Sequence, residues 1–190
     1  MSSRAILCPR NTIVDHINEL ILDQFLGDCV TCFSIDSVAE FDQQALYPVE
    51  YLNSLNLGGL PPHKLILKVG APIMLLRNMD PVRGHCNGTH YILRAVTQCN
   101  IDAQIASDEY VANMLLIPQI PLMPMDSSLP ITLRRRPFPV RPAFAMSINK
   151  SQGQTLERAG VLLTEPVCTS QLLSVDGQKT FDSVFKAVVL

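Results

Sequence analysis

The chain has 190 residues, of which 47% are hydrophobic and 17% are charged, and its formal net charge is −2. Disordered chains combine low hydrophobicity with high net charge, and collagen needs far more than 9 glycines, so the composition excludes both classes. No run of about 18 unbroken apolar residues is present, so no membrane span is expected. The length fits one large domain, or one domain with an insertion, and the low charge suggests a missing partner over one face.

Residues 5–8 form a short apolar segment that ends at Pro9 and predicts a β-strand. A helix is expected next, because apolar residues then recur at steps of three and four: Ile13, Val14, Ile17, Leu20, Ile21 and Phe25. We expect Asn11 or Thr12 to cap the start of this helix and Gly27 to close its end. Its outer face is acidic, with Asp15, Glu19 and Asp23. Strand, turn and helix in this order make half of a βαβ unit.

The middle of the chain has a different pattern. Residues 47–63 are rich in glycine and proline and predict a turn-rich connector. Short strands are expected from Lys64 onward, at residues 65–69, 72–77, 91–96 and 114–117. Asp80-Pro81 and Asn87-Gly88 are turn signals between two of these strands. Short strands at this spacing predict a small antiparallel barrel. The four prolines within residues 118–130 predict an extended crossing at an edge.

The last third returns to the first pattern. An apolar strand is expected at residues 144–148, a polar turn follows at 149–154, and another strand is expected at 160–163. The predicted fold class is therefore α/β, with a parallel-sheet frame built from both ends of the chain and a β-rich insertion at residues 47–125.

The distribution of charge is more informative than its sum. Residues 1–60 contain two basic and eight acidic residues, whereas residues 126–190 contain eight basic and five acidic residues. No acidic residue lies between Asp126 and Glu157. The same stretch holds five basic residues, namely Arg134, Arg135, Arg136, Arg141 and Lys150. Such a stretch is typical of a surface that faces phosphate groups. The alternative is a loop whose arginines pair with the acidic N-terminal third.

Six cysteines are scattered along the chain, and the opening residues MSSRAILCP lack the basic leader and apolar core of a signal peptide. A reducing intracellular setting is therefore expected. Cys29 and Cys32 form one C-x-x-C, and Cys86 lies near His85 and His90. Because zinc sites normally pair two such motifs, we expect the cysteines to be small buried hydrophobic residues, and no metal ligand is assigned.

The run FAMSINKSQGQT at residues 144–155 resembles the phosphate-contacting motif of superfamily-one helicases of the Pif-like (petite integration frequency) group, including those of Helitron transposons. The resemblance extends through RRRPFPVRPAFA, LKVGAPIMLLRNMDPVRGHCNGTHY and YPVEYLNSL to the opening ILCPRNTIVDHIN. It covers about residues 4–168. Several blocks in the right order make it more specific than any one motif.

This resemblance implies the C-terminal part of an ATP-dependent DNA helicase. Residues 1–46 and 126–168 would form the second RecA-like domain, a parallel sheet with flanking helices. Residues near 47–95, within the insertion at 47–125, would form an SH3-like β-barrel subdomain, and residues 169–190 are a divergent tail. Family members move 5′ to 3′ along single-stranded DNA and hold ATP and Mg²⁺ between two RecA-like domains. The resemblance also implies roles in DNA repair, recombination and telomere maintenance, in the nucleus or alternatively the mitochondrion.

The resemblance also implies roles for individual residues. Hydroxyl and amide groups in the polar turn would bind DNA phosphates without reading bases, and nearby cations would add charge. The residues expected at the DNA backbone are Ser147, Asn149, Lys150, Ser151 and Arg141. Gly153 would allow close backbone approach, and Gln152 or Gln154 would face the nucleotide cleft. Arg77 and Asn78 would either brace the barrel or bind DNA. No catalytic residue is assigned to this chain.

The sequence also departs from the family. No G-x-x-x-x-G-K-[ST] motif occurs, and the closing Ala-Leu-Ser-Arg block of the family is replaced by a tail without any arginine after Arg158. The first RecA-like domain of the same polypeptide is therefore an expected missing partner, and the isolated chain should bind single-stranded DNA weakly without ATPase activity. The alternative is a noncatalytic nucleic-acid-binding or interaction module from a truncated gene or a transposon copy.

Overall fold

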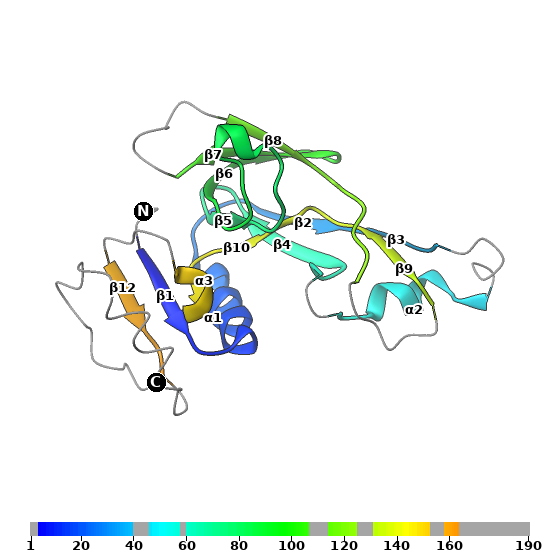
Figure 1. The fold of residues 1–190 in the computed structure, drawn as a ribbon, viewed down its shortest axis with the longest axis horizontal. Helices are drawn as coiled ribbons and strands as arrows, with labels where there is room; N and C mark the ends of the chain where they lie inside the picture. Colours follow the sequence, from blue (N-terminus) through cyan, green and yellow to red (C-terminus); the bar gives the residue numbers. More distant parts are fainter. Residues whose placement is uncertain are drawn as a thin grey trace.

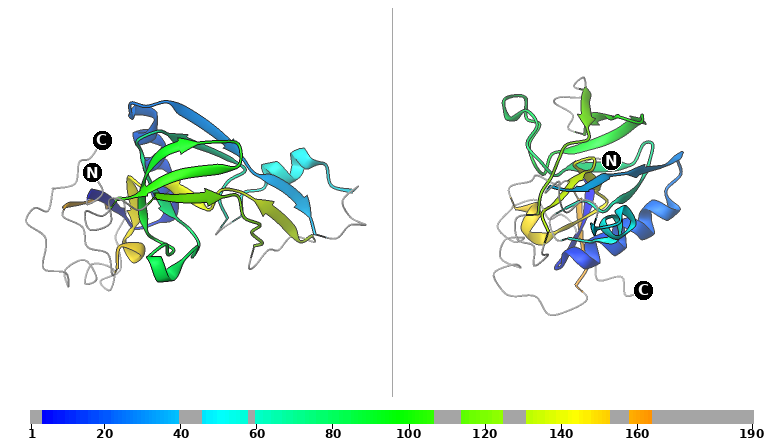
Figure 2. Two further views of the ribbon diagram at one scale, coloured as in Figure 1. Left: turned by 90° about the horizontal axis from the view of Figure 1, so that it is seen from above. Right: turned by 90° about the vertical axis from the view of Figure 1, so that its right-hand side faces the viewer.

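The computed structural model describes residues 4–39, 46–57, 60–106, 114–124, 131–152 and 158–163. These residues form a small parallel α/β part at one end of the molecule and a larger antiparallel β part beside it (Figure 1). Seen from above, a two-stranded ribbon carries the chain further toward the opposite end, where a short helix lies beside it (Figure 2).

The α/β part is built on β1 (Arg4–Cys8), which lies between β11 (Ala145–Ser147) and β12 (Arg158–Val161). Both neighbours run parallel to β1, which confirms the βαβ pattern expected from the two ends of the sequence. Helix α1 (Asn11–Gln24) packs on one face, where Val14 meets Cys8 and Ala145. Parallel strands need cover on both faces, and Leu7 on the opposite face is only 2% exposed.

The predicted caps of α1 are wrong. Arg10 occupies the N-cap position without a side-chain cap, so Asn11 and Thr12 lie inside the first turn. At the other end, Phe25 leaves the helix in an extended conformation, and Lys68 Nζ donates to the carbonyls of Asp23 and Phe25 at 2.9 Å each. A cation from a distant strand thus satisfies carbonyls that a glycine turn was expected to satisfy.

Gly27 has a different role from the predicted one. A Cβ atom at this position would lie 2.5 Å from the carbonyl oxygen of Val69. Only a residue without a side chain permits this approach of two backbone segments. Gly27 therefore allows the backbone after α1 to lie close to the backbone at the end of β4 (Lys64–Lys68).

Asn18 ties α1 to the edge of the parallel sheet. Its Nδ2 donates to the carbonyl of Ala145 at 3.2 Å, and its Oδ1 accepts from the Ala145 amide at 2.8 Å. The side chain is buried, with 4% of the residue exposed. The Asn18 side chain thereby satisfies both the N–H and the C=O of Ala145 on the edge strand β11, which a neighbouring strand would otherwise satisfy.

The larger sheet is antiparallel and has the order β10-β5-β6-β7-β8. Its strands are β5 (Pro72–Leu75), β6 (His90–Val96), β7 (Asn100–Ile105), β8 (Met114–Pro118) and β10 (Val140–Pro142). The largest core cluster lies on it and includes Leu75, Tyr91, Leu93, Ile101 and Ile117. The strands expected at 72–77, 91–96 and 114–117 are confirmed, the first with a shorter span and the other two each one residue longer. Strand β7 was not predicted, although its exposure alternates along NIDAQI.

Two ribbons extend from this sheet. Strand β2 (Cys29–Phe33) pairs with β4 (Lys64–Lys68), and β3 (Ile35–Val38) pairs with β9 (Leu133–Arg136), both antiparallel. Strand β4 confirms the strand expected at 65–69. Leu52 of α2 (Val49–Ser54) packs against Val38 and Leu133, so the predicted connector at 47–63 contains a helix. The domain boundaries remain a prediction. Strand β10 lies beyond the expected insertion at 47–125, yet it pairs with β5 inside that insertion.

The turns follow the expected signals. Asp80 precedes the short 3-10 helix η2 (Pro81–Arg83), and Gly88 adopts a φ of 92° in the Asn87-Gly88 turn. The polar turn expected at 149–154 begins instead as one helical turn, α3 (Ile148–Ser151). No helix within the described ranges is long and apolar enough to cross a membrane.

Candidate nucleic-acid interface

The polar segment after β11 lies at the carboxyl edge of the parallel sheet. Strands β1 and β11 end in register, with Cys8 opposite Ser147, and α3 starts immediately after that residue. In open parallel α/β sheets, ligands bind outside the carboxyl ends of the strands. The chain topology thus places α3 where such a fold presents its ligand-binding loops (Figure 1).

The predicted backbone-contacting residues of this segment differ in accessibility. Asn149 and Lys150 are exposed, whereas Ser147 is 8% exposed and makes no capping hydrogen bond to α3. Ser151 Oγ donates to the carbonyl of Ile148 at 2.7 Å, so its proton is already used inside α3. Gln152 is exposed directly after the helix. Gly153 and Gln154 lie outside the described residues.

Arg141 approaches this edge from β10. Its Nε and Nη2 atoms are buried and have no hydrogen-bond partner among the described residues. Burial lowers the pKa of the Arg141 guanidinium, and the Asp15 carboxylate acts in the opposite direction. These two buried nitrogens leave strong donors without an acceptor among the described residues, and a ligand with oxygen acceptors would satisfy them.

Lys150 shares the same electrostatic environment. Partial burial lowers the pKa of its ammonium, the charge of Arg141 lowers it further, and Asp15 raises it. The side chain still reaches solvent. The positive charges of Arg141 on β10 and Lys150 on α3 therefore repel each other, and the Asp15 carboxylate on α1 attracts both. An anion bound between them would relieve the repulsion between like charges.

The three arginines of β9 point to alternate faces of the strand, so one is buried and two are exposed. Arg135 points inward and pairs with Asp36, its Nη2 lying 2.8 Å from Oδ2, with both side chains 0% exposed. Pairing with the acidic N-terminal third, the alternative left open by the sequence, is therefore correct for this arginine. Arg134 and Arg136 are exposed on the other face of the ribbon.

The cysteine pair does not converge. Cys29 is exposed and Cys32 is buried, because residues three apart in a strand point to opposite faces. Among the described residues, no group of three or more His, Cys, Asp or Glu side chains is placed to hold a metal ion.

Sequence reasoning missed the part played by Asp15. It was assigned to the acidic outer face of α1, and it is indeed exposed, yet its charge acts on both Arg141 and Lys150. The order of the elements along the chain could have predicted this position of Asp15. A helix that follows β1 starts at the carboxyl edge of the sheet, so its first turns lie beside any loop that follows a neighbouring parallel strand.

Comparison with known proteins identifies related sequences. Residues 50–96 match the family model described as DNA helicase Pif1, 2B domain. The ATP-dependent DNA helicase PIF1 of Danio rerio is 28% identical, over 93% of this chain and 27% of the relative. The chain thus spans about a quarter of the length of that helicase.

Solved structures give the same relationship at the level of the fold. The Pif1 helicase of Candida albicans is 22% identical, with a TM-score of 0.65, over 91% of this chain and 42% of that protein. Bacteroides Pif1 bound to single-stranded DNA is 20% identical, with a TM-score of 0.62, over 90% of this chain and 37% of that protein. The family model, the relative and the fold agree, and the chain is similar to one segment of the Pif1 helicases.

Proposed function

We propose that this chain supplies the part of an ATP-dependent 5′ to 3′ DNA helicase that holds the backbone of single-stranded DNA. The observation that carries the proposal is that Nε and Nη2 of Arg141 are buried without a hydrogen-bond partner among the described residues. Lys150 is exposed after β11 at the carboxyl edge of the parallel sheet, and the charge of Asp15 acts on both cations. The Bacteroides relative that was crystallised with single-stranded DNA has the same fold, which supports the choice of ligand.

The geometry suits contact with phosphates and not with bases. Asn149 and Lys150 are exposed and would meet the backbone first, and the unused Nε and Nη2 of Arg141 would pair with phosphate oxygens. Ser147 would donate from the buried end of β11. Ser151 would take part only after its bond to Ile148 opens. Such contacts fix the position of the strand without reading its sequence.

The remaining assignments belong to the same proposal. Residues 1–46 and 126–168 would form the second RecA-like domain, with the SH3-like subdomain near 47–95, which overlaps the matched 2B region at 50–96. ATP and Mg²⁺ would be held mainly by a first RecA-like domain. Gln152, Gly153 and Gln154 would face the nucleotide and transmit its state to the DNA loop. The activity belongs in the nucleus or the mitochondrion, in repair, recombination and telomere maintenance.

Binding to a fluorescent oligothymidine, measured by anisotropy over a range of salt concentrations, tests the proposal. Each phosphate contact adds about 0.7 to the slope of log K against log salt for single strands, so Lys150→Gln and Arg141→Gln should each lower the slope by about that amount. Lys64→Gln is the matched control, because Lys64 is exposed on the distant strand β4. Equal slopes for all four proteins, or an oligonucleotide that does not bind, would overturn the proposal and favour a protein-interaction module.

Phosphate release from ATP tests the second part of the proposal. The isolated chain should release none above background, with or without the oligonucleotide, because the groups that grip the triphosphate lie in another domain. A DNA-stimulated ATPase that disappears in Lys150→Gln would contradict this assignment.

A further inference from the structure

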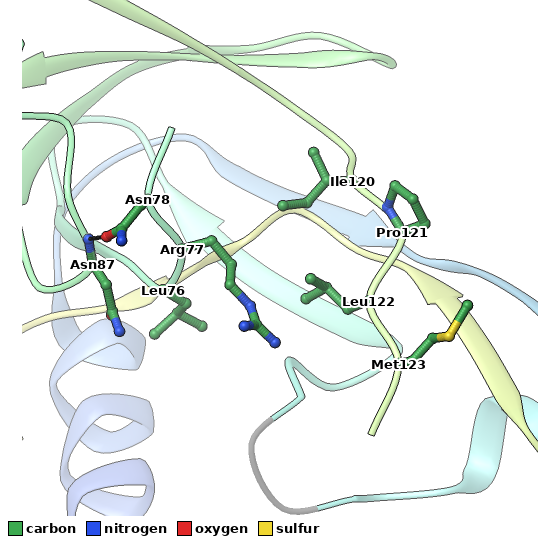
Figure 3. A pocket seen from close by; sticks show the side chains of 8 residues that line it. All are labelled: Leu76, Arg77, Asn78, Asn87, Ile120, Pro121, Leu122 and Met123. Carbon is green, nitrogen blue, oxygen red and sulfur yellow. Dashed lines mark hydrogen bonds between the residues drawn. The ribbon is translucent and has the colours of Figure 1, made fainter. Parts of the chain in front are cut away.

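An open groove lies between the end of β5 and the crossing segment, which here means residues 120–123 before β9. Its volume is about 520 Å³. This value lies within the range of about 300–1,000 Å³ that is usual for small-ligand sites. Figure 3 shows the eight lining side chains, which are Leu76, Arg77, Asn78, Asn87, Ile120, Pro121, Leu122 and Met123.

The two polar residues that the sequence grouped together behave differently. Asn78 braces the loop, because its Oδ1 accepts from the Asn87 amide at 2.7 Å (Figure 3). Arg77 braces nothing, since its guanidinium forms no hydrogen bond or ion pair with the described residues, and it projects into the groove. The structure therefore supports the bracing role for Asn78, and DNA binding by Arg77 stays a prediction.

The walls of the groove differ in chemistry. The crossing segment contributes Ile120, Leu122 and Met123, and the opposite side contributes the Arg77 guanidinium and the amides of Asn78 and Asn87. Among the described residues that line the groove, none carries a carboxylate. A complementary ligand would carry negative charge beside a flat apolar group. A nucleotide has both, and a guanidinium both pairs with phosphate and stacks on a base.

The position of the groove connects it to the proposed DNA edge. Strand β5 pairs with β10 so that Met74 lies opposite Arg141, and the groove begins two residues further, at Leu76. Leu76 also donates its amide to Pro139 at 2.8 Å, which extends the same pairing. Three residues of strand, from Met74 to Arg77, span about 10 Å. The groove therefore lies close to Arg141 along the same pair of strands.

We infer that the groove is a second DNA subsite, which takes one unstacked nucleotide of the bound single strand. Arg77 pairs with its phosphate, Met123 and Leu122 pack on its base, and the Asn78 and Asn87 amides meet polar groups of the base or the sugar. This inference rests on the proposed function, because the same strand must first bind at Arg141 and Lys150.

Methionine footprinting of the whole chain with hydrogen peroxide gives a direct readout. Met123 in the groove and Met114 on β8 are 51% and 55% exposed, so they should oxidise at similar rates when free. Saturating oligothymidine should slow oxidation of Met123 several-fold and leave Met114 unchanged. An oligonucleotide that binds the chain without protecting Met123 overturns the subsite and leaves the proposed function intact.

A charge-matched pair of variants separates the subsite from general attraction. Arg77→Gln should weaken oligothymidine binding about tenfold and remove the protection of Met123, because one charged phosphate contact is lost. Arg83→Gln removes the same charge from an arginine whose side chain is 78% exposed and lies outside the groove lining, and it should change affinity less than twofold. Equal effects of the two variants overturn the subsite.

Two further outcomes distinguish the causes of failure. Absence of oligothymidine binding by the unaltered chain overturns the proposed function and the subsite together. Protection of Met123 by a polyglutamate peptide, without protection by oligothymidine, overturns the subsite in favour of an acidic protein partner. Unchanged circular dichroism of Arg77→Gln shows that the variant folds, as expected for a side chain that forms no hydrogen bond with the described residues.

Discussion

Arg135 binds the Asp36 carboxylate from inside the core, with Nε 3.1 Å from Oδ1 and 3.0 Å from Oδ2, and Nη2 2.8 Å from Oδ2. The same guanidinium donates to the carbonyls of Pro61 and Leu52, and Ser34 Oγ donates to Asp36 Oδ1 at 2.6 Å. One buried pair therefore joins β3, β9, α2 and the segment before β4. Buried charges are tolerated when their hydrogen-bonding capacity is used in this way.

Removing one partner of this pair should be costly. Arg135→Ala is expected to lower the free energy of unfolding by about 3–5 kcal/mol, because it leaves the Asp36 carboxylate buried without its counter-ion. Urea unfolding followed by circular dichroism measures the change. Arg134→Ala, next to it on the exposed face, should change stability by less than about 0.5 kcal/mol. Similar losses in both variants would show that the buried pair has no special role.

Gly27 should not tolerate even a methyl group. Gly27→Ala places a Cβ atom 2.5 Å from the Val69 carbonyl oxygen, so the backbone must shift, and a loss of about 1–3 kcal/mol is expected. Gly160→Ala is the control, because the nearest atom there lies 4.0 Å away, on Ile6. Thermal melts of the two variants give the comparison. A melting temperature of Gly27→Ala at or above that of Gly160→Ala would contradict the prediction.

Lys68 should stabilise α1 from outside the helix. Lys68→Met removes the ammonium that binds the carbonyls of Asp23 and Phe25, and we expect a loss of about 1 kcal/mol. Hydrogen exchange of the last turn of α1 should also become faster. Lys64→Met, on the same strand and exposed, should leave both quantities unchanged. Unaltered exchange in Lys68→Met would argue that solvent satisfies these carbonyls equally well.

Alkaline pH should destabilise the larger sheet through Tyr91. Burial, followed by the charge of Cys86, raises the pKa of the Tyr91 hydroxyl from 10.0 to about 12. The unfolded chain loses this proton at a lower pH than the folded chain. The stabilisation is therefore complete below about pH 10 and is lost as the pH rises through 12. The free energy of unfolding should fall by on the order of 2–3 kcal/mol over this range.

Urea unfolding between pH 8 and pH 12 measures this contribution. Tyr91→Phe should flatten the decline, although it leaves His85 Nδ1 without the hydroxyl that lies 2.9 Å away. The variant should therefore be less stable than the natural chain at pH 8 and closer to it at pH 12. Parallel pH profiles for the two proteins would exclude Tyr91 as the titrating group.

The sequence predicted those elements whose buried side chains are apolar. The periodicity of α1 and the apolar strands at both ends identified the parallel α/β frame, because such segments carry a clear hydrophobic pattern. Strands β2 and β3 were missed for the opposite reason. Their inward positions include Cys32 and Asp36, and the exposed positions include Phe33 and Ile35, so exposure alternates while hydrophobicity does not follow it.

The candidate site was predictable only in outline. The basic stretch and the polar turn are visible in the sequence, but the fate of each arginine depends on a partner far along the chain. Arg135 is buried because it meets Asp36, 99 positions away. Arg141 is half-buried, the charge of Asp15 acts on it, and two of its buried nitrogens have no partner among the described residues. The groove at Arg77 likewise needs Met123 from another segment. Neither local composition nor spacing reports such long-range neighbours.

The construction of the parallel sheet also determines when it can form during synthesis. Asn18 and Ala145, which join α1 to β11, are 127 positions apart, and the antiparallel strands lie between them. Such distant contacts must overcome the entropy of closing a long loop, so they form late. The N-terminal strand and helix therefore leave the ribosome long before their neighbours, with an apolar face unpaired. Pulse-labelled hydrogen exchange should show the amides of β6 and β7 protected before those of β1.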